Sequence, residues 1–403
     1  MYMPYASLVI SVSLWCVSGN QPASSPFVLE TSDRELVTGS LVELSEDWSV
    51  RLNGREEVRA AGRDVVSLRR VGAVPPPVPA RSFVLLVNGD VIPFNGIRLN
   101  DERFVLNPLI GNTKEIRLNP SQVALVWFSG PDAERHPDKL RRTLAAGQRT
   151  RDRILLQNGD TLEGTITAMD EKVVRTEVDK RNQELPISKM AIIAMNTELA
   201  SRRKPNGPYV RVVLANGGRL SLSSATADGE TLSGKLTSGI PIHVNVRDLV
   251  SLSIFQGCAE YLSDMKPSKV EQTPYLDSTL APVLDGTAKD RDLRVGGGRY
   301  DKGIGMHGAC RMTFDLRGAF KRIESLVALD DVTGREGRAR VEVLVDGKAQ
   351  QLGLERDLTH RNGPLTVRVD VTGAKQLTLV VDFGERGDVQ ADVNWVDARL
   401  IKK

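Results

Sequence analysis

Apolar and polar residues alternate with a period of two along much of this chain, which is the pattern of half-buried β-strands. Four stretches open in this way and then reach a polar turn: residues 27–36, 83–90, 154–160 and 210–218. Two of these turns read Asn-Gly-Asp, and Asn-Gly between apolar runs favours a tight hairpin because both residues tolerate a positive φ. The pattern therefore predicts a strand, a turn and a second strand in each stretch.

Each stretch closes with a further apolar run after a short polar segment. These runs cover residues 65–68, 123–128, 191–195 and 249–255. We expect four small antiparallel β units of roughly 45 residues, which must curl or pair with a neighbour to bury their one apolar face. Their expected bounds are 27–72, 83–130, 154–198 and 209–257. The strand-turn-strand opening resembles small SH3-like and Sm-like barrels, from which we carry over no RNA binding.

The period changes between the second and third units, where residues 131–153 predict a helical, basic linker. A proline at the start, two leucines four residues apart and a glycine at the end predict a helix over residues 138–146. Residues 134–153 include seven Lys and Arg against three Asp and Glu. This charge is either a patch for an anionic ligand or the solvated face of a linker. A stiff proline-rich spacer at 74–79 joins the first two units.

An apolar run of 12 residues, 6–17, lies near the N-terminus. It is too short to span a membrane as a helix and suits a secretory signal, although no Lys or Arg precedes it. We therefore expect residues 1–25 to be a signal peptide and the protein to be secreted, periplasmic or at the cell surface. A buried strand or a short anchor is the alternative. No apolar stretch reaches 18 residues, so no integral membrane span is expected.

The composition argues against several classes of function. The 403 residues include 54 Lys and Arg against 51 Asp and Glu, a formal net charge of +3. This near balance argues against a dedicated nucleic-acid binder, which needs a strong basic excess. Three cysteines are too few for a disulfide scaffold, and four dispersed histidines argue against a metallohydrolase with clustered histidine ligands. After signal cleavage Cys258 and Cys310 remain, and the sequence leaves open whether they form a disulfide.

Strand-like alternation is dense in the C-terminal third of the chain. Clear runs cover residues 340–346, 365–371 and 377–383, with Gly-containing turns between strands and no convincing long helix. Many short strands at close spacing indicate a β-sandwich. The sequence therefore predicts an all-β protein in which tandem small β units are followed by a C-terminal β-sandwich.

Several short motifs occur in order in this third: Tyr300, 302–305, His307, 314–316, 330–331, 345–348, 371–375, Leu377, Asp392 and Trp395. Together they closely resemble the NPCBM/NEW2 family of carbohydrate-binding modules, which are found attached to glycoside hydrolases. The resemblance covers residues 274–403 and implies a galactose-binding-domain-like jelly roll that binds sugar. The segment after Asp331 is rich in Arg without an aromatic platform, so the resemblance names no particular sugar. The repeats with the lead-in at 261–267 resemble secreted proteins of planctomycete-type bacteria.

Five residues of this third are candidates for carbohydrate binding: Tyr300, His307, Trp395, Asp397 and Arg399. Alternation along the last strand places Trp395, Asp397 and Arg399 together on the face opposite the core. A pyranose lays its C–H face on an aromatic ring, while carboxylate and guanidinium groups take its hydroxyls. Alternatively, Trp395 plugs one end of the sandwich and His307 satisfies buried backbone groups.

Asp330 and Asp331 are candidate calcium ligands, because calcium takes oxygen ligands from loops. The alternative is a turn pair that caps backbone N–H groups. Residues 303–308 fit Gly-x-Gly-x-x-Gly, but a strand pattern follows them where a dinucleotide site needs a helix. We expect these glycines to allow close approach to another strand, and no cofactor beyond a structural calcium ion.

These observations predict an exported, non-catalytic protein whose jelly roll recognises a polysaccharide or other glycan at a rim or face. The β units would form a stalk or an interaction array. No G-x-S-x-G, H-E-x-x-H or P-loop motif is present. The alternative is a structural or protein-interaction role at the cell surface without sugar binding, and a third hypothesis is a glycoside hydrolase with a cryptic carboxylate pair.

Overall fold

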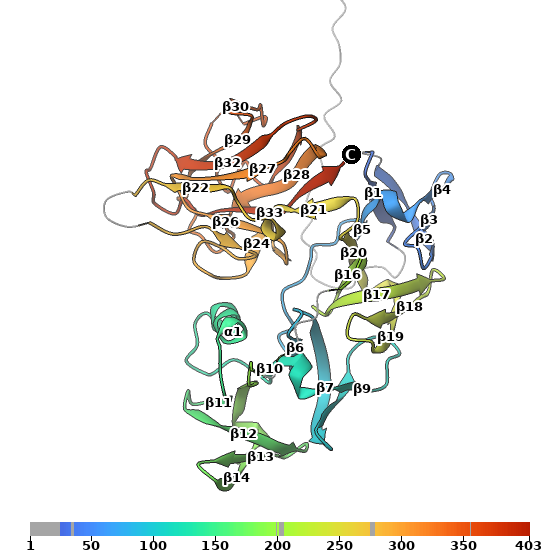
Figure 1. The fold of residues 1–403 in the computed structure, drawn as a ribbon, viewed down its shortest axis with the longest axis vertical. Coiled ribbons are helices and arrows are strands. Elements are labelled where there is room, and N and C mark those ends of the chain that lie inside the picture. Colours follow the sequence, from blue (N-terminus) through green and yellow to red (C-terminus); the bar gives the residue numbers. More distant parts are fainter. Residues whose placement is uncertain (1–24, 34–35, 199, 201–204, 275–278, 355) are drawn as a thin grey trace, which may run out of the picture.

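The computed structural model describes residues 25–403 except 34–35, 199, 201–204, 275–278 and 355. The expected signal peptide at 1–25 therefore lies, but for Ser25, outside the described residues. Strands dominate the fold, and the C-terminal third forms a separate β-sandwich against which the small β units lie (Figure 1). The all-β prediction is confirmed.

Each β unit has five strands, with a short 3-10 helix before the last one. Unit 1 consists of β1 (Phe27–Thr31), β2 (Leu36–Leu44), β3 (Val50–Asn53), β4 (Glu57–Ala60), η1 (Gly62–Asp64) and β5 (Val65–Arg70). Unit 2 consists of β6 (Phe83–Leu86), β7 (Val91–Asn100), β8 (Arg103–Pro108), β9 (Ile116–Leu118), η2 (Pro120–Gln122) and β10 (Val123–Trp127). Unit 3 consists of β11 (Asp152–Leu156), β12 (Thr161–Met169), β13 (Val173–Val178), β14 (Arg181–Pro186), η3 (Ile187–Lys189) and β15 (Met190–Ala194). Unit 4 consists of β16 (Tyr209–Leu214), β17 (Arg219–Ala227), β18 (Thr231–Leu236), β19 (Pro241–Asn245), η4 (Val246–Asp248) and β20 (Leu249–Phe255).

The first two strands of each unit form the hairpin that the alternation predicts. In the Asn-Gly-Asp turns, Gly89 and Gly159 have φ of +87° and +89°, which glycine adopts without strain. The Asn88 side chain accepts a hydrogen bond from Asp90 N at 3.0 Å and closes the turn. A register shift in the second strand of every unit bends that strand toward the third, so each unit curls on itself.

The units pack on one another rather than hanging as separate beads. The last strands pair across units: β5 with β20, and β10 with β15, both antiparallel. A single-residue pairing joins β17 of unit 4 to β7 of unit 2. The units therefore lie in the order 3, 2, 4, 1, and apolar side chains from all four form one cluster. This continuous core supplies the burial that a single small unit lacks.

One α-helix, α1 (Pro137–Ala146), occurs in the described residues, at the position that the sequence predicts. Pro137 occupies its first turn, and Gly147 ends it with a φ of −67° rather than in the left-handed conformation of a C′ glycine. Leu144 packs into an apolar cluster with Trp127 and Ala194 of units 2 and 3. Within the described ranges, no helix combines the length and apolar character needed to cross a bilayer.

The C-terminal third forms two antiparallel sheets that face each other. The larger sheet consists of β23 (Val283–Leu284), β26 (Gly303–Met306), β33 (Val393–Lys402), β28 (Phe320–Leu329) and β31 (Leu365–Asp370), with β21 (Ala259–Tyr261) also paired to β33. The smaller sheet consists of β22 (Lys269–Gln272), β27 (Cys310–Asp315), β32 (Gln376–Phe383), β29 (Ala339–Val345) and β30 (Lys348–Ala349). The C-terminal third also contains a separate hairpin of β24 (Leu293–Val295) and β25 (Gly298–Tyr300) and the 3-10 helix η5 (Leu262–Asp264). The β-sandwich prediction is confirmed, and β21 and β22 extend it upstream of residue 274.

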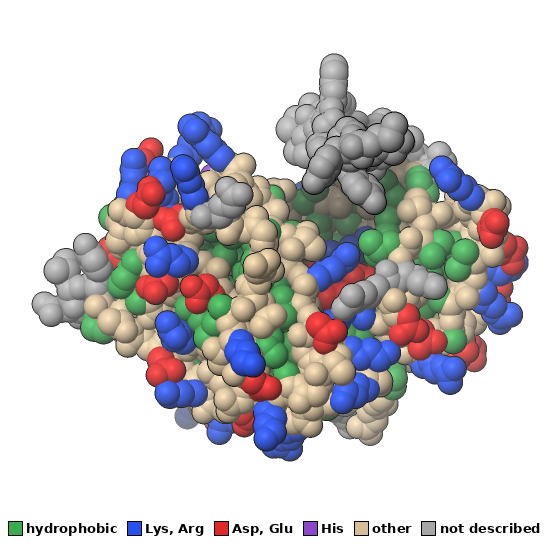
Figure 2. All heavy atoms as spheres, turned by 90° about the horizontal axis from the view of Figure 1, so that it is seen from above, with side chains coloured by type: hydrophobic (Ala, Val, Ile, Leu, Met, Phe, Trp, Pro, Cys, Tyr) green, Lys and Arg blue, Asp and Glu red, His purple; other side chains and the backbone are tan. Residues whose placement is uncertain are grey.

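The two sheets enclose one apolar core, which includes Met306, Phe314, Leu379 and Trp395. Cys310 lies in this core and Cys258 is half-buried outside it, and both are free thiols. On the face drawn in Figure 2, basic and acidic side chains are interspersed rather than gathered into fields of one sign. That mixture agrees with the near-neutral charge of the sequence.

The glycines of residues 303–308 serve backbone packing. They form β26 and the turn after it, and the chain continues into strand β27 rather than into a helix. A Cβ atom on Gly305 would lie 2.4 Å from Thr287 Cα and from Gly286 O. One on Gly303, whose φ is +150°, would lie 2.4 Å from Trp395 O. The close approach that the sequence predicts for these glycines is therefore confirmed.

Gly305→Ala should lower the free energy of unfolding by about 1–3 kcal/mol, the usual cost of overpacking a tight site. Gly130→Ala is the matched control, because the new Cβ would meet its neighbours only at 3.8 Å. Urea denaturation of the two variants measures the difference. Equal unfolding midpoints would contradict this assignment.

Candidate functional site

Trp395 lies in the centre of the sandwich core and is 0% exposed, so the expectation that it lies on an exposed face is wrong. The cause is a β-bulge in β33: Val396 pairs with Leu326, but Arg399 pairs with Glu324, which leaves one extra residue in β33. Asp397 within this bulge has a φ of +48°. The extra residue reverses the alternation, so the core face changes phase along the strand.

Tyr300 and Asp397 do come together, but in a crevice that unit 1 and unit 4 close. Arg69 of β5 donates to the Asp397 carboxylate at 2.5 Å, and Tyr261 lines the same crevice. Its volume is about 40 Å³, which is room for a water molecule and not for a sugar ring. Burial raises the pKa of Tyr300 to about 12. These two residues belong to an interface between parts of the chain.

Arg399 is 4% exposed and also faces unit 1. Its guanidinium contacts Glu30 of β1 and Glu324 of β28, the latter at 3.2 Å. Arg322 binds Glu324 at 2.7 Å and donates to Thr31 O at 3.2 Å. Burial alone would raise the pKa of Glu30, but the charge of Arg399 outweighs it, and the pKa is lowered to about 2. The outer face of β33 is thus a docking face for unit 1.

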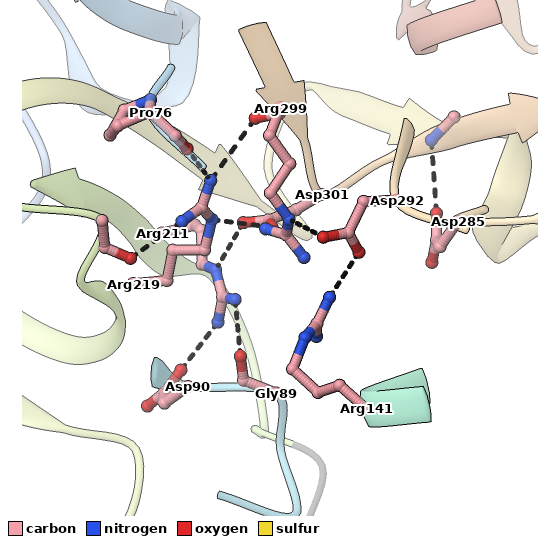
Figure 3. Close-up of polar contacts among 12 residues, drawn as sticks. Pro76, Gly89, Asp90, Arg141, Arg211, Arg219, Asp285, Asp292, Arg299 and Asp301 are labelled. Carbon is pink, nitrogen blue, oxygen red and sulfur yellow. Dashed lines mark hydrogen bonds and ion pairs between the residues drawn. The ribbon is translucent and has the colours of Figure 1, made fainter. Parts of the chain in front are cut away.

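A second set of buried charges joins the sandwich to units 2 and 4 (Figure 3). Asp301 lies among three guanidinium groups: Arg219 Nε is 2.9 Å away, Arg211 Nε is 3.3 Å away, and Arg299 also contacts the carboxylate. Arg211 and Arg219 come from β16 and β17 of unit 4. Arg219 also donates to Pro76 O at 2.6 Å, so the proline spacer is held in the same contact.

The ion pairs continue on both sides of Asp301. Arg211 lies 2.7 Å from Asp90, the fully buried aspartate of the Asn-Gly-Asp turn of unit 2. Asp292 lies 3.1 Å from Arg299 and 2.5 Å from Arg141 of α1. We call the set the Asp301 network: Asp90, Arg141, Arg211, Arg219, Asp292, Arg299 and Asp301. Its four arginines share three aspartates, contributed by unit 2, unit 4, α1 and the sandwich.

Burial and charge act in opposite directions on these groups. Burial alone would raise the pKa of Asp301, but Arg219, Arg299 and Arg211 outweigh it and hold that pKa well below its usual range. Burial raises the pKa of Asp90 despite the charge of Arg211. Charges out of water are tolerated only when they are paired, so this interface depends on all its members being present.

His307 lies at the other end of β26 from Tyr300, in the loops at one end of the larger sheet. Its Nδ1 is 2.9 Å from Asp392 Oδ1, while Lys289 Nζ and Thr333 Oγ1 donate to Asp392 Oδ2 at 2.7 Å and 3.0 Å. We call Lys289, His307, Thr333 and Asp392 the Asp392 rim. Three loops that are distant in sequence meet at this one buried carboxylate.

The Asp392 carboxylate is held in its ionised form by its partners. Burial alone would raise its pKa, but hydrogen bonds from His307 and Lys289 outweigh it and lower the pKa to about 2. Because the carboxylate is ionised and only accepts, His307 Nδ1 carries the proton that it donates, and its Nε2 stays available for a further hydrogen bond. The Lys289 side chain is 52% exposed and keeps further N–H groups for a ligand. The rim therefore presents one ring nitrogen and one ammonium group that can hydrogen-bond a ligand.

Asp330 and Asp331 have different surroundings. Asp331 is exposed and accepts hydrogen bonds from Gly296 N at 2.9 Å and Gly297 N at 2.7 Å, the capping role that the sequence left open. Asp330 is 2% exposed, and burial raises its pKa to about 6, with the charge of Asp392 adding to the rise. Among the described residues, no three His, Cys, Asp or Glu side chains gather as a metal site. Calcium binding by the pair stays a prediction.

Of the predicted sugar-binding residues, only His307 lies at the rim. Lys289 and Thr333 were missed because they stand in loops without a periodic pattern. Asp392 belongs to the family motif, but no local sequence signal shows that three side chains hydrogen-bond to it. Their convergence depends on strand pairing between β26, β28 and β33.

The geometry defines a β-sandwich with a polar rim of loops. Residues 259–401 match the model of the NPCBM/NEW2 domain family. This part of the chain is therefore an NPCBM/NEW2 domain, as its motifs predicted. A comparison with curated proteins found no match.

Several of the similar solved structures contain CBM51 modules. The CBM51 of Clostridium perfringens GH95 in complex with methyl-galactose is 22% identical, over 35% of this chain and 99% of that one, with a TM-score of 0.31. The CBM51-2 in complex with GlcNAc and INT domains of Clostridium perfringens ZmpB are 18% identical to this chain. The match covers 46% of this chain and 44% of that one, with a TM-score of 0.32. The tandem CBM51 modules of a family 98 glycoside hydrolase from Streptococcus pneumoniae are 12% identical to this chain. The match covers 94% of this chain and 88% of that one, with a TM-score of 0.32. The domain assignment rests on the family match and the sheet architecture, not on these likenesses.

Asp301→Asn should lower the free energy of unfolding by about 3–5 kcal/mol, because it leaves buried arginines without their shared anion. Asp290→Asn is the matched control: Asp290 pairs with Arg142 across the same contact at 2.9 Å, but its side chain is 46% exposed. An exposed pair contributes about 0–1 kcal/mol. Chemical denaturation measures both variants, and similar losses would show that the Asp301 network is not the dominant contact.

The free energy of unfolding of the Asp330→Asn variant should rise relative to that of the wild type as the pH rises from 5 to 7.5. The raised pKa means that the folded state holds the Asp330 proton more tightly than the unfolded state, so the wild type loses stability as the pH rises through about 6. The difference should change by roughly 1 kcal/mol or more. Denaturation curves at each pH measure it, with Asp331→Asn as the neighbouring variant. An equal change in both variants would count against Asp330 as the group responsible.

Proposed function

We propose that this chain is an exported, non-catalytic carbohydrate-binding protein whose NPCBM/NEW2 domain recognises a glycan at the Asp392 rim. The observation that carries the proposal is the convergence of Lys289, His307 and Thr333 on one buried carboxylate, in a domain of a carbohydrate-binding family. Preorganised polar groups are what a weakly binding sugar site needs, because little entropy is lost when they engage a ligand.

The surroundings of the rim match the two faces of a sugar. His307 Nε2 would hydrogen-bond a sugar hydroxyl, and Lys289 would donate to a ring or hydroxyl oxygen. The half-buried Phe383 ring lies against Gly308, next to His307, where a Cβ would meet it at 3.0 Å. Val332 and Val389, in the loops next to Thr333 and Asp392, are 43% and 51% exposed. Apolar side chains beside fixed polar groups are typical of small-ligand sites.

Burial supports binding rather than hydrolysis. The raised pKa of Asp330 beside the ionised Asp392 resembles the division between an acid and a base. Both side chains are only 2% exposed, however, and Asp392 is held by three partners. A general acid must come within hydrogen-bond reach of the glycosidic oxygen, so neither carboxyl is placed for that role.

The β units support this function indirectly. Through the Asp301 network and the Glu30–Arg399 contact they cover the outer face of β33, whereas the Lys289 side chain at the Asp392 rim is 52% exposed. We propose that they hold the sugar-binding domain in a fixed orientation on an extended support. Export follows from the apolar run at 6–17 and stays part of the proposal.

Lys289→Met and His307→Ala should each weaken glycan binding by about 10-fold or more, the size expected for losing a hydrogen bond to a charged or preorganised group. A glycan array identifies the ligand, and isothermal titration with the best glycan measures the loss. His243→Ala, at an exposed histidine on β19, is the matched control and should bind as the wild type does. Failure of the wild type to bind any glycan would refute the proposal and favour a structural or protein-interaction role.

A further inference from the structure

The four β units meet through two kinds of contact, which alternate along their order 3, 2, 4, 1. The first kind joins the last strands of two units, β10 with β15 and β5 with β20. The second kind joins unit 2 to unit 4 where their turns and second strands meet, and Val91 of β7 pairs there with Arg219 of β17. We call the second kind the turn contact. Units 3 and 1, at the two ends, each keep a turn-contact surface that no other described unit covers.

The turn contact has an approximate two-fold axis. The two residues of its strand pairing each begin the second strand of their own unit. Equivalent positions that pair with each other lie on a local two-fold axis. The turn asparagines repeat this symmetry: Asn88 of unit 2 donates to Thr237 Oγ1 of unit 4 at 3.0 Å, and Asn216 of unit 4 donates to Leu109 O of unit 2 at 2.7 Å. Two units can therefore meet here as equal partners.

The ion pair of the turn contact uses only one of its two symmetry-related places. Arg211 of unit 4 donates from Nη1 to Asp90 at 2.7 Å and from Nη2 to Gly89 O at 2.8 Å (Figure 3). In the related place, unit 4 has Gly218 at the position of the aspartate, and unit 2 has Phe83 at the position of the arginine. Unit 2 thus supplies the acid and unit 4 supplies the base.

Unit 3 contains both halves of this ion pair. Its turn at 158–160 reads Asn-Gly-Asp and places Asp160 where unit 2 has Asp90. Arg153 stands five positions before the turn asparagine, as Arg211 does in unit 4. Both arginines pair with the third residue of the second strand and with the last strand of their unit. Two copies of unit 3 would therefore form the ion pair at both places.

The turn-contact surface of unit 3 is open in the described structure. Residues 158–161 are exposed, and a Cβ atom on Gly159 would meet no described atom within 4 Å. The Asp160 carboxylate bonds to the asparagine side chain of its own turn. The corresponding end of unit 1 is covered by the sandwich, where Arg322 donates to Thr31 O at 3.2 Å. Unit 3 is thus the end at which the row of units can continue (Figure 1).

We propose that unit 3 binds unit 3 of a second copy of this chain through the turn contact, which makes the protein a two-fold dimer. Thr161 would pair with Thr161 of the other copy, and each Arg153 would bind Asp160 of the other copy. Continuity with the contact inside the chain and the complementary charges both favour a second copy as the partner. The dimer does not rest on glycan binding, but it would give one particle two Asp392 rims and raise the avidity for a polymeric glycan.

Glu163 limits the strength of this contact. Its Oε1 accepts from Nε and Nη2 of Arg153 at 3.1 Å and 2.7 Å, and these bonds do not engage Nη1, the atom with which Arg211 binds its aspartate. Arg211 also lies 3.3 Å from Asp301, so an arginine at this position serves two carboxylates. The incoming Asp160 would nevertheless approach a second negative charge, where unit 4 has a serine. We therefore expect a reversible dimer.

Sedimentation velocity of the full chain over a range of concentrations measures the association, and the wild type should shift from one chain to two. Asp160→Arg and Arg153→Asp each place like charges opposite each other, so each should weaken association by about 100-fold or more. Glu163→Ser should strengthen it, because the like charge is removed. Glu171→Arg, at an exposed acid beyond the other end of β12, is the matched control and should associate as the wild type does.

An equimolar mixture of Asp160→Arg and Arg153→Asp tests the pairing itself. In a mixed dimer the new arginine faces the new aspartate, and the two unchanged side chains face each other, so the mixture should associate although neither variant does so alone. A wild type that stays a single chain at every concentration would overturn the inference. So would a dimer that survives both charge reversals, a mixture of folded variants that fails to associate, or an equal loss in Glu171→Arg. If Arg153→Asp fails to fold by circular dichroism, Asp160→Arg and Glu163→Ser decide.

Discussion

The carboxylate of Asp301, shared by three arginines, is the contact on which the assembly depends. It lies where the sandwich meets unit 4 and the proline spacer, and Asp90 of unit 2 and Asp292 next to Arg141 of α1 extend it on both sides. Because a buried charge is stable only beside its partner, none of these parts can leave without exposing or stranding the charges of the others. The chain is therefore one assembly and not a string of independent domains.

This contact, together with the salt bridge from Arg399 to Glu30, determines which faces of the sandwich the β units cover. The outer face of β33 is occupied by unit 1, and the crevice beside Tyr300 is too small for a sugar. At the end of the larger sheet where Asp392 gathers its three partners, the Lys289 side chain stays 52% exposed.

The arginines of the chain hold its parts together in two different ways. Arg141, Arg211, Arg219 and Arg299 are buried beside aspartates and bind the parts together. Arg149 is equally buried, yet its neighbours are carbonyl oxygens, and one N–H group stays unsatisfied. Arg149 therefore ties the end of α1 to unit 3 through carbonyl oxygens, whereas the four arginines of the Asp301 network act through ion pairs.

The sequence by itself determined the local architecture: the strand-turn-strand units, the helix at 138–146, the sandwich and its family. These follow from the period of apolar residues and from turn residues, which act over a few positions. It did not determine the position of Trp395, because one bulge at Asp397 reverses the alternation. It also did not determine the partners of Arg399 and Asp301. Glu30 stands 369 positions from Arg399 in the sequence, and Arg211 stands 90 positions from Asp301. Only the tertiary structure brings such residues together, since ion pairs form through space and leave no periodic trace in the chain.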